Sequence, residues 1–192
     1  RDKIVKLMNS ISKNIIVVLD GAYVEYVEKD DYDKGFSLTN EYENIILTRT
    51  FSKTYGLAAL RVGWCYTSQK IADIINKIKP PFNTTTISQY LAIKALEDKE
   101  HIENSVKLNF EVKNWFEKEL QSLNIKTRQT EGNFSLIETS VDEADKISNH
   151  LINDGIIIRR LNSYNLPNFI RISIGTKEEM KTTIESLKKF NV

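Results

Sequence analysis

Two groups of chemically active side chains follow two apolar runs in the first third of the chain. Asp20 and Tyr23 come directly after the run from Ile15 to Leu19. A second apolar run, at residues 45–47 of the segment 44–50, is followed by a group made up of Thr50, Ser52, Lys53 and Arg61. Singly, each of these residues has an ordinary structural explanation as a turn former, a core phenol or an ion-pair partner. Together they supply a carboxylate, a phenol, two hydroxyls, a lysine and an arginine, a set that would suit an anionic, aromatic cofactor.

Other kinds of site and partner fit the sequence less well. The two histidines, His101 and His150, have no ligand-like spacing and Cys65 is the only cysteine, so we expect no metal centre. Lys53 precedes the nearest glycine and no G-x-x-x-x-G-K segment occurs, which excludes a P-loop. The 192 residues carry 27 basic and 26 acidic side chains, a balance that argues against a nucleic-acid partner. The longest unbroken apolar run has five residues, whereas a membrane span needs roughly 20, so we expect no membrane partner.

The elements that would position the two groups read as strands of an α/β sheet. Residues 2–13 show helical spacing of apolar side chains, and residues 15–19 and 44–50 predict strands separated by a polar loop at 28–40. The run 15–19 is wholly apolar and β-branched in character, which is typical of a parallel strand buried on both faces. In open α/β sheets, ligands bind at the carboxyl ends of the strands. Both groups would therefore lie at one ligand-binding edge.

The pattern changes in the second half of the chain. Beyond a strand at 64–67, helices are expected at 71–78, 86–98 and 101–123. From about residue 125 the elements alternate, with strands at 133–138, 156–160 and 169–174 and helices at 142–153 and 177–190. This change of rhythm predicts a domain boundary near residue 100.

The two groups, in their sequence context, resemble fold-type I pyridoxal-phosphate aminotransferases, and within that class most closely the histidinol-phosphate aminotransferases. The resemblance is carried by D-G-A-Y at residues 20–23 and by T-F-S-K-T-Y-G-L-A-A-L-R-V-G at residues 50–63. Three later stretches, at residues 81–83, 155–159 and 166–176, are similar as well. The resemblance extends over essentially the whole chain.

This resemblance implies a fold and a place for the chain within it. Family members run to roughly twice this length, in keeping with two domains, so the chain is expected to be the C-terminal half of such an enzyme. Residues 1–100 would form the C-terminal part of a large cofactor-binding domain with a mostly parallel sheet, whose N-terminal part is missing. Residues 101–192 would form a small α+β C-terminal domain.

The resemblance also implies a role for three residues at the cofactor ring. Lys53 would form the Schiff base with pyridoxal 5'-phosphate and would later shuttle the proton. Asp20 would face the pyridine nitrogen, where its negative charge keeps that nitrogen protonated and makes the ring an electron sink. Tyr23 would donate a hydrogen bond to the phenolate oxygen of the ring.

Five further residues match positions that bind anionic groups in the family. Thr50, Ser52 and Arg61 would hold the cofactor phosphate, because hydroxyls donate to it and a guanidinium pairs with its oxygens bidentately. Arg171 would grip the anionic end of the substrate, and Arg159 would help to bind the phosphate of histidinol phosphate. Arg171 lies between two isoleucines on a predicted strand, where an unpaired guanidinium is costly.

The implied activity is a PLP-dependent transamination in histidine biosynthesis. L-histidinol phosphate would be the amino donor and 2-oxoglutarate the acceptor, giving imidazole acetol phosphate and glutamate, in a cytoplasmic homodimer. An aromatic-amino-acid aminotransferase or a threonine-phosphate decarboxylase of the same fold is an alternative, as is an inactive fragment or interaction module. Gly21 stands where the family usually has an acidic residue, and we expect this departure to have a local structural effect without loss of chemistry.

Overall fold

The computed structural model describes residues 1–190 as two compact units, and each is considered by itself. Unit 1 runs from Arg1 to Glu103, and unit 2 begins at Asn104. The division falls inside one long helix, α5 (Lys99–Ser122). The sequence places the boundary near residue 100. Within residues 1–190, no helix combines the length and the apolar character that crossing a membrane requires.

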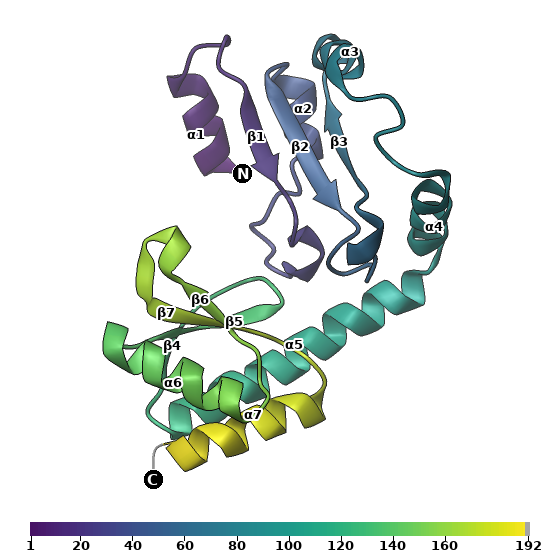
Figure 1. Cartoon of the computed structure of the whole chain (residues 1–192). Helices are drawn as coiled ribbons and strands as arrows, with labels where there is room; N and C mark the ends of the chain where they lie inside the picture. Colours follow the sequence, from purple (N-terminus) through teal and green to yellow (C-terminus); the bar gives the residue numbers. More distant parts are fainter. Residues whose placement is uncertain (191–192) are drawn as a thin grey trace. The chain divides into compact units, whose positions relative to one another are not determined.

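Unit 1 is built on a three-stranded sheet in the order β1-β2-β3 (Figure 1). Strands β1 (Val17–Asp20) and β2 (Ile45–Thr50) are parallel, and β3 (Gly63–Thr67) is antiparallel to β2. The helices of this unit are α1 (Asp2–Ser10), α2 (Phe36–Glu41), α3 (Gln69–Ile78) and α4 (Thr86–Glu97). The α/β class that the sequence predicts is confirmed, and the described part of the sheet contains one parallel and one antiparallel pairing.

The core of unit 1 lies where α1 and α2 pack on one face of this sheet. Alternate residues of β2 are buried, so that Ile45 and Leu47 meet Met8 from α1 and Leu38 from α2. The sequence predicts a loop at 28–40, and this prediction is wrong from residue 36, where α2 begins. The segment is polar and rich in turn-forming residues, but Leu38 is fully buried and anchors the short helix.

Strand β1 departs from its sequence prediction. The run 15–19 predicts burial on both faces, but the strand begins at Val17, and Ile16 and Val18 are each 55% exposed. The physical reason is that β1 lies at the edge of this sheet and that α1 and α2 contact only the face formed by Val17 and Leu19. The apolar run therefore predicted a strand correctly but not its surroundings within this chain.

Unit 2 is an antiparallel sheet packed against helices. Its four strands have the order β4-β5-β7-β6, with bounds β4 (Lys126–Arg128), β5 (Phe134–Glu138), β6 (Arg159–Leu161) and β7 (Leu166–Ser173). Helices α6 (Val141–Asn153) and α7 (Lys177–Phe190) accompany α5. The core holds Phe116, Leu120, Ile137, Ile170 and Leu187, all fully buried. The short β4 was not expected from the sequence, since its three residues are polar.

Candidate active site

The parallel pairing of β1 and β2 brings the ends of the two strands to one edge of the sheet. Asp20, the last residue of β1, lies opposite Thr48 in the register. The Thr48 hydroxyl donates to Asp20 Oδ1 at 3.4 Å, and the backbone N–H of Ala22 donates to the same oxygen at 3.1 Å. Asp20 is exposed at this edge. These two contacts hold its carboxylate at the carboxyl end of the strands.

A tight turn beyond β2 carries Lys53. The Ser52 N–H donates to Thr50 Oγ1 at 3.0 Å, and the Gly56 N–H donates to the Lys53 carbonyl at 2.9 Å. The Leu57 N–H closes the turn on the Phe51 carbonyl at 2.9 Å. Gly56 has a φ of +70°, which glycine adopts without the steric cost of a Cβ. The local sequence thus fixes the backbone of Lys53 at the same edge as Asp20.

Lys53 and Tyr23 join the two groups that the sequence singled out. The Lys53 Nζ lies 5.4 Å from the centroid of the Tyr23 ring, within the range of a cation–π contact. Tyr23 comes from the turn that follows β1, whereas Lys53 comes from the turn that follows β2. Both side chains are half-buried. The amine is therefore held beside the turn that begins at Asp20.

Arg61 is directed towards the same turn by an unusual backbone conformation. It follows a short 3-10 helix (Ala58–Leu60) and has a φ of 51°, in the left-handed region that non-glycine residues seldom adopt. Its Nη1 donates to the Ala58 carbonyl at 2.9 Å and to Ser52 Oγ at 3.5 Å. The guanidinium and the Ser52 hydroxyl consequently lie next to each other, and Arg61 is exposed.

Arg49 explains the glycine at position 21. It is buried, at 8% exposure, and its guanidinium donates to the carbonyls of Thr48 (2.8 Å) and Lys34 (2.5 Å). A Cβ placed on Gly21 would lie 2.0 Å from Arg49 Nη1. Gly21 therefore leaves room for the guanidinium directly after Asp20. The sequence predicts a local structural effect at this departure from the family pattern. In the structure, that effect is the space which Gly21 leaves for the Arg49 side chain.

Glu25 is a carboxyl group in this region whose protonation is affected by burial. Burial raises the pKa of the Glu25 carboxyl above its ordinary value, and this effect exceeds the opposing ones of its backbone hydrogen bond and of Arg49. Above the ordinary pKa, the unfolded chain loses this proton before the folded chain does. The free energy of unfolding therefore falls as the pH rises from the ordinary pKa of Glu25 through the raised one.

We expect Glu25→Gln to raise the melting temperature at pH 7, because the amide removes the cost of a buried negative charge. The gain should shrink markedly near about pH 4, where the wild-type carboxyl is mostly protonated in both states. Thermal unfolding at pH 4 and pH 7 measures this difference. Glu28→Gln, at an exposed position close by, is the matched control. Equal gains for Glu25→Gln at both pH values would contradict the burial argument.

Arg159 and Arg171 lie in unit 2 and are directly opposite each other on β6 and β7. Arg159 donates to the Tyr164 hydroxyl at 3.2 Å, and the Arg171 guanidinium carbon lies 5.3 Å from the centroid of the Phe134 ring. Within residues 1–190, the Nε of Arg171 is buried and makes no hydrogen bond. Like charges directly opposite on neighbouring strands repel, so an anion that binds near this pair would reduce the repulsion.

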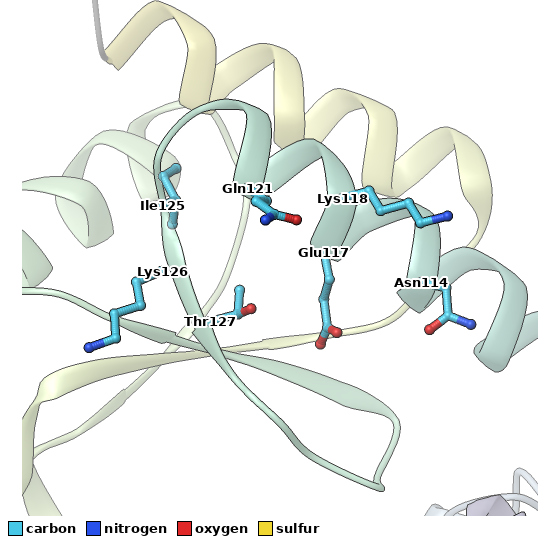
Figure 2. Close-up of a pocket in the computed structure, with 7 residues that line it drawn as sticks. All are labelled: Asn114, Glu117, Lys118, Gln121, Ile125, Lys126 and Thr127. Atoms are coloured by element: carbon cyan, nitrogen blue, oxygen red, sulfur yellow. The ribbon is translucent and has the colours of Figure 1, made fainter.

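Two grooves of unit 2 are lined by residues other than Arg159 and Arg171. One, with a volume of about 570 Å³, is bounded by α5 and the start of β4, and Figure 2 shows its Lys118 and Lys126 side chains pointing away from one another. The other, of about 380 Å³, is formed by residues 155–157, 172–175 and four residues of α7. Neither lining includes a residue that the sequence predicts as functional.

One residue beside the candidate site was not singled out by the sequence. The sequence indicates no role for His101, but its Nε2 lies 3.2 Å from the carbonyl oxygen of Thr54, the residue after Lys53. The separation of 47 positions means that no local pattern could have indicated this contact.

Comparisons with known proteins match nearly the whole of this chain. The family model of aminotransferase class I and II matches residues 1–187. The histidinol-phosphate aminotransferases of Pelagibacter ubique and Rhodopseudomonas palustris (strain BisB18) are 42% and 35% identical, over 97% and 98% of this chain. The crystal structure of histidinol-phosphate aminotransferase from Sinorhizobium meliloti, in complex with pyridoxal-5'-phosphate, covers 99% of this chain with a TM-score of 0.91 at 26% identity.

The matches also bear on the extent of the chain. It spans about half the length of these relatives: 54% and 53% of the two sequences and 52% of the structure. The prediction that the chain is the C-terminal half of such an enzyme is not supported. These matches give the fraction of each relative that the chain covers, and they do not show that it is the C-terminal fraction. The family itself is established by a model that covers nearly every residue, and the chain belongs to the aminotransferase class I and II family.

Proposed function

We propose that the full-length protein is a PLP-dependent aminotransferase that transfers an amino group from L-histidinol phosphate to 2-oxoglutarate. The observation that carries this proposal is the convergence of Asp20, Lys53 and the Ser52–Arg61 pair at the carboxyl edge of β1 and β2. The names of the relatives support the choice of substrate. The products would be imidazole acetol phosphate and glutamate.

The residues at this edge fit pyridoxal phosphate by the chemistry of their donors and acceptors. When bound, this cofactor supplies an aldehyde that amines attach to and a ring that withdraws electrons from the reacting carbon. Lys53 supplies the amine, Asp20 an anion for the ring nitrogen, and Tyr23 a hydroxyl for the ring oxygen. A phosphate group requires hydroxyl and guanidinium donors, which Thr50, Ser52 and Arg61 provide.

The hydrogen bonds already present orient the phosphate donors. Thr50 Oγ1 accepts from the Ser52 N–H, so its own O–H is left to donate. Ser52 Oγ accepts from Arg61 Nη1, so the Ser52 hydroxyl proton can likewise turn to an anion. The two hydroxyls and the guanidinium therefore form a compact set of donors suited to a phosphate group.

Lys53 would also move the proton of the substrate carbon. This task needs an amine that lies beside the reacting atoms and is restrained in position, because proton transfer depends on short distances. The turn Phe51–Leu57 restrains its backbone and the Tyr23 ring lies beside its amine. Asp20 holds its charge in place through Thr48 and Ala22.

Arg159 and Arg171 would bind the anionic groups of the substrates. Their cross-strand pairing means that both side chains start from one face of the sheet of unit 2. The Arg159 guanidinium lies against Tyr164, and that of Arg171 lies against Phe134. Because guanidinium forks pair with phosphate and carboxylate alike, this pair suits both the phosphate of the amino donor and a carboxylate of 2-oxoglutarate.

Steady-state kinetics of the full-length protein test the choice of substrate. We expect kcat/KM with L-histidinol phosphate to exceed that with phenylalanine by about 100-fold or more, because an ionic phosphate contact is lost. A preference for phenylalanine would favour an aromatic-amino-acid aminotransferase. Release of carbon dioxide from threonine phosphate would favour a decarboxylase of the same fold.

We include a cytoplasmic homodimer in the proposal. Helix α4 supports the dimer, because Ile87, Tyr90 and Ile93 on it are each more than half exposed, and exposed apolar surface of this kind marks interaction sites. The mass of the full-length protein in solution, measured by light scattering, checks the oligomeric state.

A further inference from the structure

The turn that carries Lys53 contacts a distant part of the chain through Thr54. Thr54, which follows Lys53, is only 2% exposed. Buried backbone carbonyls need a hydrogen-bond donor. The His101 ring supplies it, with Nε2 at 3.2 Å from the Thr54 oxygen. Because a carbonyl can only accept, the proton of this hydrogen bond is on Nε2.

His101 is itself held firmly at the start of α5. Its backbone N–H donates to Asp98 Oδ1 at 3.0 Å, which caps the first turn of the helix. Its ring also lies against the turn at Gly56, since a Cβ on that glycine would be 3.9 Å from Nε2. The ring therefore joins a fixed helix end to both Thr54 and Gly56.

We propose that His101 is a positioning residue for Lys53: it fixes the turn that carries the reacting amine by donating to the Thr54 carbonyl. This inference rests on the proposed function, in which Lys53 is the residue that reacts. The hydrogen bonds within the turn, from Gly56 to Lys53 and from Leu57 to Phe51, define its shape. The bond from His101 comes from outside the turn and, with the hydrogen bond from the Phe51 N–H to the Val62 carbonyl, restrains where the turn lies.

The consequence for the reaction follows from the covalent link between Lys53 and Thr54. A displacement of the Thr54 peptide displaces the backbone of Lys53 and hence its Nζ. Small misplacements of a reacting group reduce the rate strongly while leaving contacts to other parts of the substrate intact. Loss of the His101 contact should therefore reduce kcat and leave the KM for the amino donor nearly unchanged.

The test uses two variants of the full-length protein and one matched control. His101→Phe keeps a planar ring but has no donor, whereas His101→Gln retains an N–H donor on its side chain. His150→Phe is the control, because His150 makes the same kind of contact in unit 2, from Nε2 to the Ser186 carbonyl at 2.8 Å. Amide hydrogen exchange of Gly56 and Leu57 is measured in the cofactor-free protein, and kcat and KM in the loaded enzyme.

In His101→Phe we expect exchange at Gly56 and Leu57 to become about tenfold faster and kcat to fall about tenfold, the size of effect expected for the loss of one hydrogen bond. His101→Gln should recover most of both changes, and His150→Phe should leave both near the wild-type values. Unchanged exchange in the turn of His101→Phe would overturn the proposal, as would an unchanged kcat or an equal effect in His150→Phe.

The failure of this inference is distinguishable from the failure of the proposed function. The exchange measurement needs no cofactor and reports the position of the turn alone. If the wild-type protein took up pyridoxal phosphate through Lys53 and His101→Phe behaved like wild type, only the positioning role would be wrong. If the wild-type protein did not react through Lys53, the proposed function would be wrong and the positioning role would fall with it.

Discussion

Lys53→Ala in the full-length protein is expected to reduce transamination by at least about 1,000-fold, because it removes both the covalent attachment of the cofactor and the group that moves the substrate proton. Alanine fits the turn, whose hydrogen bonds are all made by the backbone at this position. Stability should therefore change little. The measurements are kcat/KM with L-histidinol phosphate, and borohydride reduction followed by peptide mass analysis to locate the bound cofactor.

Lys70→Ala is the control for this experiment. Lys70 lies on α3 and is exposed, so its removal changes the charge of the protein by the same amount without altering the candidate site. Its activity and its borohydride-labelled peptide should match those of the wild-type protein. If Lys53→Ala kept the bound colour and the activity, Lys53 would not be the reacting amine.

The second large effect is expected for Asp20→Asn, which should lower kcat/KM about 100- to 1,000-fold. A carboxylate beside the ring nitrogen favours its protonated form, and the neutral amide provides no such charge. The substitution is nearly isosteric, and an asparagine oxygen can still accept from the Ala22 N–H and the Thr48 hydroxyl. The melting temperature should therefore stay close to that of the wild-type protein while activity falls.

Asp20→Glu provides the comparison for this variant. It keeps the negative charge but moves it by one methylene, so we expect more residual activity than in Asp20→Asn. Activity of Asp20→Asn within about threefold of wild type, a factor worth less than 1 kcal/mol, would show that the charge of Asp20 takes no part in the reaction.

Much of the arrangement around Lys53 could be predicted because it depends on local rules. The apolar runs at 15–19 and 45–47 predict two strands that end at Asp20 and Thr50, and the parallel pairing places both ends at one edge. The turn residues around Lys53 and the run Ser52–Arg61 are close in sequence, so their proximity required no long-range information. The roles given to these residues stay predictions that the variants above test.

Other features depended on contacts between distant residues. Short polar segments such as α2 and β4 gave little periodic signal, and α2 exists because Leu38 is buried in the core of unit 1. The exposure of Ile16 and Val18 follows from the position of β1 in its sheet, which the composition of the strand does not reveal. Gly21 could be recognised as unusual from the sequence, but its reason, the buried Arg49 guanidinium, could not.

The amino-acid sequence alone determined the α/β class, the chemical set at residues 20–23 and 50–61, and the resemblance to aminotransferases, because strand periodicity and motif spacing are properties of neighbouring residues. Only the tertiary structure decided that Lys53 lies beside Tyr23, that Arg159 and Arg171 oppose each other, and that His101 reaches the Thr54 carbonyl. Such contacts arise when strand pairing and burial bring together residues that are far apart along the chain, and the separation itself removes any local signal of them.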